Sequence, residues 1–391
     1  MSVDGLRATI DGLPLVDHHV HGATVAALDA ALFEAGLSES PWPAPAGTTH
    51  LDSQLGFAVR RWCAPVLDLP AHAPVDAYLA RRRELGAHEA TGRFLAACGV
   101  ERFLIDTGYT AEHILGPAEM AAVSGAAASE IVRLESVAEQ VAASGVDAAG
   151  FADQFTATLQ DRAQHAAGLK SVIAYRYGLD FDPEPPSQAA VRQAAGQWLR
   201  ERETAQPRLT DPVLLRHVLW CGLAVAAHRR LPLQFHVGYG DPDLTLHRSD
   251  PSLMTEFLRL AQDRRVPIML LHCYPYHRNA GYLAHAFPHV YLDVGLAVNY
   301  TGARSVAVVA ESLEVAPFGK LLFSSDAFGP AELHYLGALM WRRTTASVLS
   351  AWVDAGEWSA ADAQRIARMV GADNARRVYG LAGSQGPGGE T

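Results

Sequence analysis

A cluster of histidines follows a short apolar run near the N-terminus, in the sequence Val16-Asp-His-His-Val-His21. Because alternate side chains of a β-strand point to the same side, His19 and His21 can project together from the end of this strand. Two imidazoles at this spacing are natural nitrogen ligands for Zn2+ or a similar divalent ion. A polar loop with surface histidines is the alternative, and it explains a single histidine better than it explains this pair.

Three later apolar runs also end in a residue that can bind a metal. Residues 231–236 end in His236, residues 268–272 end in His272, and residues 321–326 end in Asp326. Each of these residues alone is more often a hydrogen-bonded core or loop residue. Their occurrence in chain order after a His-x-His pair instead predicts one shared site.

These residues need elements that bring them together, and the sequence alternates short β-branched runs with longer Ala-rich segments. Such alternation is typical of repeated βα units, in which helices connect parallel strands. We expect eight strands that close into a (β/α)8 TIM barrel, at residues 13–20, 102–106, 131–136, 169–175, 233–237, 268–272, 290–294 and 321–325. Reactive side chains then collect at the C-terminal ends of the strands. A doubly wound open sheet is the competing architecture, and the absence of a GxGxxG motif after the first strand weighs against it.

The stretch between the first two expected strands is too long for a plain loop. Residues 24–91 are rich in Ala, Pro and Leu, and we interpret them as a mostly helical insertion over the barrel mouth. Further helices are expected at residues 189–203 and 212–228, and another begins near Pro330. We assign residues 1–382 to one barrel domain and expect the Gly-rich residues 383–391 to form a disordered tail.

Composition narrows the range of functions. The chain has 391 residues, 49% of them hydrophobic, and a formal net charge of -10, which argues against nucleic-acid binding and against an acidic membrane surface. Its four cysteines form no CxxC pair, so neither a disulfide framework nor a zinc-thiolate site is expected. Without a signal peptide or an apolar run of ~18 residues, the chain is predicted to be cytoplasmic. Its expected partner is a small-molecule substrate, and homo-oligomerisation stays open.

The order of these motifs resembles that of the amidohydrolase superfamily, with His-x-His on strand one, a histidine on each of strands five and six, and an aspartate on strand eight. Residues 374–381 are similar to the closing helix of that superfamily. The resemblance is strongest to amidohydrolase-2 proteins, predicted metal-dependent hydrolases that also form the N-terminal half of nodulin/glutamine-synthetase-like fusion proteins. Segments 168–176, 236–243, 291–297 and 323–326 carry this likeness.

The resemblance implies a role for each matching residue. His19, His21, His236 and Asp326 would bind one or two divalent ions, Zn2+ or another such as Mn2+. His272 would be a second-metal ligand or a hydrogen-bond partner of the attacking water. Lys170 matches a strand-four lysine that many relatives carboxylate to bridge two metals, and a structural or substrate-side role is the alternative.

This ligand set predicts hydrolysis by a water molecule that the metal activates. Asp326 would take its proton and pass it to a leaving amine, while His272 would help to polarise the scissile carbonyl. The leading interpretation is cleavage of a C–N amide bond, in a γ-glutamyl-type or other carboxylate-bearing amide. Decarboxylation, lactone hydrolysis and uronate-type isomerisation stay open, as does a non-catalytic scaffold, although a scaffold has no need of the full ligand set.

Four residues are predicted to contact the substrate. Tyr175 and Arg176 are placed at the end of strand four, and Arg133 and Glu135 on strand three. An arginine at the barrel mouth can bind a substrate carboxylate through two parallel hydrogen bonds. Structural ion pairs are the alternative role for these residues.

Overall fold

The structure of the protein is a computed structural model that describes residues 3–109, 113–202, 205 and 208–381. The tail predicted at residues 383–391 lies outside the described residues. None of the helices formed by the described residues combines the length and the apolar content that a transmembrane span requires.

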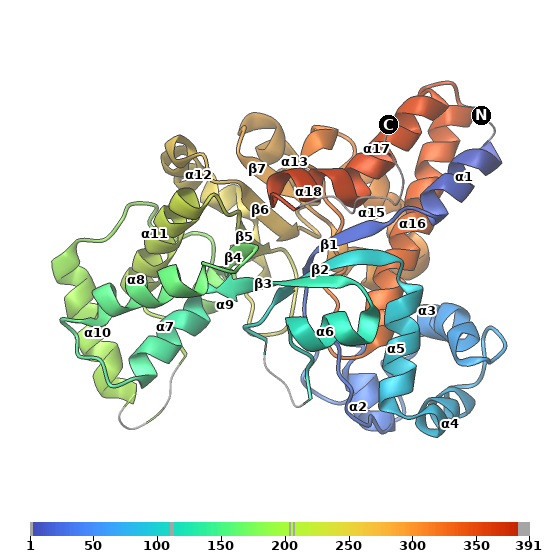
Figure 1. Ribbon diagram of the computed structural model, residues 1–391, viewed down its shortest axis with the longest axis horizontal. Coiled ribbons are helices and arrows are strands. Elements are labelled where there is room, and N and C mark those ends of the chain that lie inside the picture. Colours follow the sequence, from blue (N-terminus) through green and yellow to red (C-terminus); the bar gives the residue numbers. More distant parts are fainter. Residues whose placement is uncertain (1–2, 110–112, 203–204, 206–207, 382–391) are drawn as a thin grey trace, which may run out of the picture.

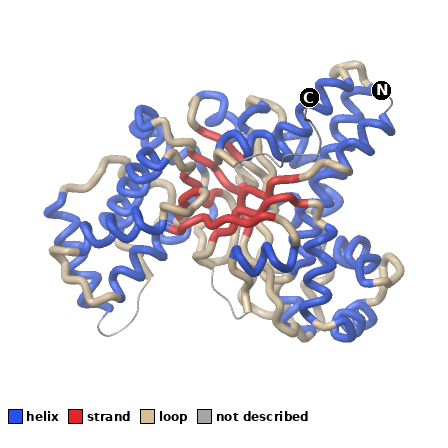
Figure 2. The backbone as a smooth tube through the Cα atoms, in the orientation of Figure 1, coloured by secondary structure: helices blue, strands red, loops and turns tan. Residues whose placement is uncertain are grey.

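The described residues form a single sheet of seven parallel strands at the centre of the molecule (Figure 2). Neighbouring strands follow the order of the chain from the first to the last, so the sheet has no point at which the strand order reverses. A doubly wound sheet requires such a reversal, and this architecture is therefore excluded. The strands are β1 Leu15–Val20, β2 Val100–Asp106, β3 Ala127–Arg133, β4 Gly168–Ser171, β5 Leu233–Val237, β6 Ile268–His272 and β7 Val290–Leu292.

The eighth predicted strand, at residues 321–325, is not a regular strand. It forms one isolated parallel bridge, between Leu321 and Leu292 of β7. On its other side, Phe323 O accepts a hydrogen bond from His18 N, at 3.2 Å, and Asp326 N donates to His19 O, also at 3.2 Å. The segment thus lies between β7 and β1, but side-chain bonds replace part of its ladder, since Ser325 N donates to the Asp17 carboxylate.

A separate small core shows that the sheet curls around its own interior. Buried apolar side chains from β1, β2, β3, β6 and the segment at 321–326 pack together, apart from the larger core between the sheet and the helices. Residues from the C-terminal helix α18 (Asn374–Val378) and Tyr379 complete this inner cluster. The members include Val16, Leu104, Ile131, Met269, Leu271 and Leu322.

Helices surround the sheet and supply the parallel crossovers (Figure 1). The predicted helices at residues 189–203 and 212–228 are confirmed within one residue at each end, as α10 and α11. The helix expected near Pro330 is α16, whose N-cap is Pro330. Outside the segment between β1 and β2, the helices before α18 are α1 Val3–Asp11, α6 Pro117–Ser124, α7 Leu134–Ala143, α8 Phe151–Arg162, α9 Ile173–Arg176, α10 Gln188–Arg202, α11 Pro212–Arg229, α12 Thr255–Ala261, α13 His277–Ala286, α14 Gly295–Tyr300, α15 Ser305–Ser312, α16 Ala331–Asp354 and α17 Ala360–Arg368.

The chain between β1 and β2 contains four α-helices and long irregular segments. The helices are α2 Ala30–Ala35, α3 Gln54–Ala58, α4 Val75–Leu85 and α5 Ala87–Ala97. Figure 1 shows α2, α3 and α4 gathered on one side of the molecule, with α5 between them and the strands. Residues 38–41, in the irregular segment between α2 and α3, line part of the cavity described below.

Several strand boundaries differ from the prediction, and two of these differences, at the ends of β3 and β4, move predicted site residues. The strand predicted at residues 131–136 is β3 and ends at Arg133, so that Glu135 lies in the first turn of α7. The strand predicted at residues 169–175 is β4 and ends at Ser171, so that Tyr175 and Arg176 lie in the short helix α9. In both places apolar residues continue past the strand, because the following helix also buries them.

Candidate metal centre

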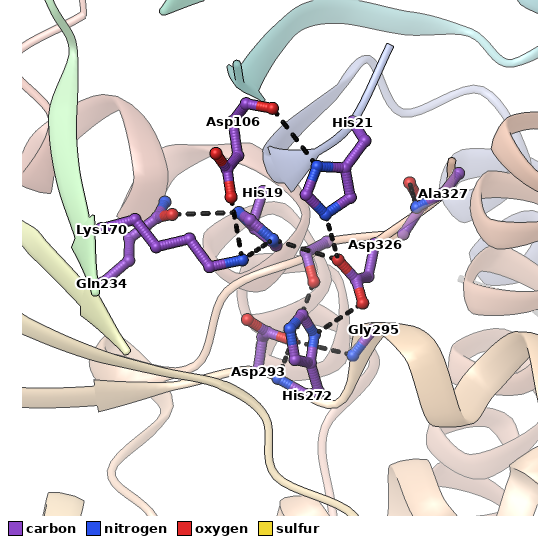
Figure 3. Close-up of polar contacts among 12 residues, drawn as sticks. His19, His21, Asp106, Lys170, Gln234, His272, Asp293, Gly295, Asp326 and Ala327 are labelled. Carbon is purple, nitrogen blue, oxygen red and sulfur yellow. Dashed lines mark hydrogen bonds and ion pairs between the residues drawn. The ribbon is translucent and has the colours of Figure 1, made fainter. Parts of the chain in front are cut away.

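Imidazoles and a carboxylate meet where the strands end, as Figure 3 shows. The Asp326 carboxylate lies at the centre of this group. Its Oδ1 is 3.0 Å from His19 Nε2 and 3.6 Å from His21 Nε2, and its Oδ2 is 3.3 Å from His272 Nδ1. The structure therefore brings together four of the residues that the sequence predicted as ligands or catalytic groups.

Hydrogen bonds fix which nitrogen of His19 carries the proton. Gln234 donates through Nε2 to His18 O, at 2.8 Å, which leaves its Oε1 as the acceptor 2.9 Å from His19 Nδ1. Nδ1 of His19 must therefore be protonated, and Nε2 presents a lone pair toward Asp326. His21 is held in the same way, since its Nδ1 lies 3.3 Å from the carbonyl oxygen of Asp106. Such bonds to the outer nitrogen orient metal-binding histidines in proteins.

Lys170 reaches the same centre from the third position of β4. Its Nζ is 2.9 Å from His19 Nε2 and 3.2 Å from Asp106 Oδ2, and its side chain is only 2% exposed. Asp106 also accepts hydrogen bonds from Arg133, through Nη2 at 2.7 Å and Nε at 3.2 Å. Because β4 ends at Ser171, Lys170 lies next to the C-terminal end of the strand, and its side chain reaches the cluster.

Burial sets the protonation of the centre. It lowers the pKa of His21 to about 3 and holds the pKa values of His19, His236 and His272 well below the usual value. All four imidazoles are then neutral near pH 7, which is the state that metal binding requires. Burial also raises the pKa of Asp326 well above its usual value, although the Lys170 cation opposes this shift.

The donor atoms of the centre fit a divalent cation. Among the described residues, both ring nitrogens of His272, Nε2 of His236 and Oδ1 of Asp326 are buried without a hydrogen-bond partner. The lone pair of His19 Nε2 faces a carboxylate oxygen, an arrangement that a cation between them would make favourable. Two overlapping groups have donor atoms within 4.8 Å of one another: His19, His272 and Asp326, and His19, His21 and Asp106.

The backbone at the strand ends aims these side chains. His272 and Asp326 have φ values of 65° and 49°, in the left-handed region that non-glycine residues rarely adopt. Asp293 braces the first of them, since its Oδ1 accepts hydrogen bonds from His272 N at 2.9 Å and Ser324 Oγ at 2.8 Å. Such unusual backbone geometry persists only where surrounding contacts impose it.

His236 lies beside the cluster that the other predicted histidine ligands form with Asp326, and not within it. Its ring is 4.7 Å from that of His272 and 4.4 Å from that of Tyr175, measured between ring centres. The structure thus places His236 next to the centre but outside both groups of close donor atoms. Gly240 allows Tyr175 this position, because a Cβ at residue 240 would lie 1.9 Å from the Tyr175 hydroxyl oxygen.

The centre opens into a cavity of about 350 Å³, which is a size typical of small-molecule sites. His21, Lys170, His236 and Asp326 line its floor. Three of the four predicted substrate contacts line the same cavity, namely Arg133, Tyr175 and Arg176.

Glu135, the fourth predicted substrate contact, has a different position. It is 1% exposed and does not line the cavity. Its Oε1 accepts hydrogen bonds from Ser171 Oγ at 2.6 Å and Val172 N at 3.0 Å. Glu135 therefore fixes the turn from β4 to α9, which carries Tyr175 and Arg176, and the prediction that it contacts the substrate is not supported by this position.

Several residues of the site were missed by the sequence analysis. Asp106 ends β2, so the rule that singled out His236 and Asp326 could have found it. Gln234 and Asp293 are polar residues inside strands or at their ends, a weaker signal. Glu39 lies in an irregular segment, where neither periodicity nor a motif marks it.

Comparisons with known proteins identify the family of this chain. The amidohydrolase family model matches residues 71–381, which is most of the chain and begins after β1. The fluG protein of Emericella nidulans is 32% identical over 242 residues, which cover 59% of this chain and 28% of fluG. The chain thus spans less than a third of that relative.

Solved structures share the whole architecture. A provisionally assigned metal-dependent hydrolase from Lactobacillus casei superposes with a TM-score of 0.84 and 25% identity, over 96% of this chain and 97% of that one. A uronate isomerase from Thermotoga maritima superposes with a TM-score of 0.63 and 15% identity, over 96% and 97% of the two chains, and this likeness concerns the fold alone.

The family match excludes the interpretation as a non-catalytic scaffold, since amidohydrolases are enzymes. The imidazoles and the carboxylate that converge at the strand ends are the donor set of a divalent metal. The chain belongs to the amidohydrolase family, and it is a hydrolase with a candidate metal site at the C-terminal ends of its parallel strands.

Proposed function

We propose that the enzyme hydrolyses a C–N amide bond in a small molecule that bears a carboxylate. The observation that carries this proposal is the position of Arg176, which lines the same cavity as Asp326. The Arg176 side chain is 6% exposed, and its Nε and Nη1 are buried without a hydrogen-bond partner in the described part of the chain. A buried guanidinium with free donors is a site for a carboxylate.

In this proposal Zn2+ is the first candidate metal, because imidazole nitrogens dominate the donor set, and Mn2+ is the second. A divalent ion held by His19, His21, His272 and Asp326 would act as a Lewis acid and lower the pKa of an adjacent water molecule. Asp326 then accepts the proton of that water and passes it to the leaving amine. A neutral His272 has one lone pair and one N–H on opposite sides of its ring, so it would serve either as a ligand of the ion or, where the ion is held by the other three residues, as a donor to the scissile carbonyl.

A second candidate reaction is isomerisation of a uronate. The uronate isomerases of Thermotoga maritima and Bacillus halodurans share the fold, and a uronate also carries a carboxylate that Arg176 could bind. Decarboxylation and lactone hydrolysis use the same kind of site, but no feature of the described residues favours them.

Amine release distinguishes these reactions. We expect the metal-loaded enzyme to release free amine from γ-glutamyl or N-acyl amino-acid amides, and to act at least about tenfold faster on them than on amides without a carboxylate, as loss of a charged hydrogen bond predicts. Uronates, lactones and aromatic carboxylates serve as the comparison set. Turnover of a uronate, or CO2 release without amine, would contradict the proposal.

We further propose that a single ion occupies the centre. The carboxylates of Asp106 and Asp326 already balance the cations of Lys170 and Arg133, so one divalent ion leaves a moderate excess of positive charge. A second ion would add two more positive charges in a buried site. That addition becomes tolerable only if CO2 converts the Lys170 ammonium to a carbamate, which releases two protons and changes the charge of this side chain from +1 to −1.

Metal analysis of protein purified with and without bicarbonate tests this count. We expect about one ion per chain under both conditions, by the charge balance above. Two ions per chain in bicarbonate, falling to one in Lys170→Met, would show instead that Lys170 is the carboxylated bridge. Carbon-13 NMR of protein prepared in labelled bicarbonate detects that carbamate directly.

A further inference from the structure

The cavity above the metal centre is lined by both acidic and basic side chains. Besides Arg176 it is lined by Glu39 and Asp241, two acids that the proposed hydrolysis does not use. Oε1 of Glu39 is buried, and none of the described residues forms a hydrogen bond with it. A buried carboxylate oxygen without a donor is costly, and a ligand that brings a donor would remove that cost.

The surroundings of Glu39 favour a cationic ligand. Burial raises its pKa to about 7, the neighbouring Tyr300 hydroxyl lowers it, and the nearby negative charge of Asp241 raises it further. Arg208, another arginine of the cavity wall, already forms an ion pair with Asp243. An ammonium group placed beside Glu39 and Asp241 would stabilise the ionised form of both acids.

The surroundings of Arg176 favour an anion. It forms an ion pair with Glu139, whose Oε1 lies 3.3 Å from Arg176 Nη2 and also accepts a hydrogen bond from Leu209 N. That single long contact offsets only part of the free-energy cost of burying the guanidinium, because Nε and Nη1 remain without a hydrogen-bond partner in the described structure. Arg133, the other arginine of this wall, is held by Asp106 and is not available in the same way.

We infer that the cavity recognises the zwitterionic head group of an α-amino acid, with its ammonium at Glu39 and Asp241 and its carboxylate at Arg176. This inference rests on the proposed function and narrows its substrate class to amides whose acyl part carries a free amino-acid head group. A neutral or purely anionic acyl group would leave the Glu39 oxygen unsatisfied. The head group therefore distinguishes the substrate from simple carboxylate-bearing amides.

Binding of three matched probes to the metal-loaded enzyme tests the inference by calorimetry. L-glutamate carries both charged groups, glutarate lacks the ammonium, and 4-aminobutyrate lacks the α-carboxylate. We expect L-glutamate to bind about 10-fold to about 100-fold more tightly than either of the others, the range for loss of one charged hydrogen bond.

Two substitutions assign the groups. Glu39→Gln should bring the ratio between the glutarate and L-glutamate dissociation constants close to one, while the preference over 4-aminobutyrate persists. Arg176→Gln should bring the ratio between the 4-aminobutyrate and L-glutamate dissociation constants close to one, while the preference for L-glutamate over glutarate persists. Glu357→Gln removes an exposed glutamate that does not line the cavity, and it should preserve both ratios.

The possible outcomes separate this inference from the proposed function. Equal affinity for L-glutamate and glutarate, or no L-glutamate binding at millimolar concentration, would overturn the inference. So would an equal loss for all three probes in Glu39→Gln, which would show that Glu39 maintains the shape of the cavity and does not contact the ammonium. If the predicted binding pattern is found but γ-glutamyl amides release no amine, the head-group site stands and the proposed hydrolysis fails.

Discussion

Replacing His19 and His21 together by alanine is expected to remove the bound metal and to lower kcat/KM by at least about 10⁴-fold, equivalent to ~5.5 kcal/mol. Both Nε2 atoms face the Asp326 carboxylate, and both Nδ1 atoms are tied to outer acceptors. The double variant therefore deletes two oriented donors that no neighbouring side chain can replace. Metal content by mass spectrometry and amide turnover should fall together.

A matched double variant separates this effect from a general effect of losing histidines. His165 and His228 are exposed and lie outside the cavity, so His165→Ala with His228→Ala should retain metal and activity. Thermal unfolding and circular dichroism of both proteins establish that each is folded. A folded His19→Ala, His21→Ala protein with normal turnover would remove the proposed site.

The sequence predicted the positions of the strand ends better than the lengths of the strands. His19, His236, His272 and Asp326 each follow an apolar run, and the parallel order of the strands places such ends on one rim. The lengths of the strands were harder to predict, because the apolar residues after Arg133 and Ser171 are compatible with a buried helix as well as with a strand. Short apolar runs do not distinguish these states by periodicity.

Strand alternation correctly placed His19 and His21 on one side, but it did not predict that His18 also reaches buried partners. The pairing of β1 with β2 shifts between Asp17 and Val20, and consecutive histidines both reach buried partners. His18 contacts Asp293 and Tyr379, while His19 contacts Gln234 and Lys170. An irregularity of this kind re-aims side chains beside an active site, and a two-residue repeat in the sequence does not reveal it.

Contacts between distant segments were only partly predictable. Arg176 was predicted to contact the substrate because it follows strand four, whereas Glu39 belongs to an irregular segment in which no local pattern predicts that it lines the same cavity. Only the three-dimensional structure reveals that both side chains have buried polar atoms without a hydrogen-bond partner among the described residues. The chemistry of the metal end was thus predictable from motifs, whereas the chemistry of the substrate end required the three-dimensional arrangement.

Asp326→Asn should separate metal binding from proton transfer. Asparagine has nearly the same shape and keeps one oxygen that can face the metal, but it cannot accept the proton of the attacking water. The left-handed backbone at residue 326, with φ of 49°, is also tolerated by asparagine better than by most residues. We expect partial retention of metal and a fall in kcat of about 10²-fold to about 10⁴-fold, the usual contribution of a general base.

The measurement that decides this role is turnover per bound metal ion. Dividing the rate by the measured metal content removes the effect of weaker binding, so what remains reports the loss of the carboxylate as a base. Asp263→Asn, at an exposed aspartate outside the cavity, should leave both quantities unchanged. If metal-loaded Asp326→Asn keeps a rate within a few-fold of the unmodified enzyme, another group must move the proton, and His272 would be the next residue to replace.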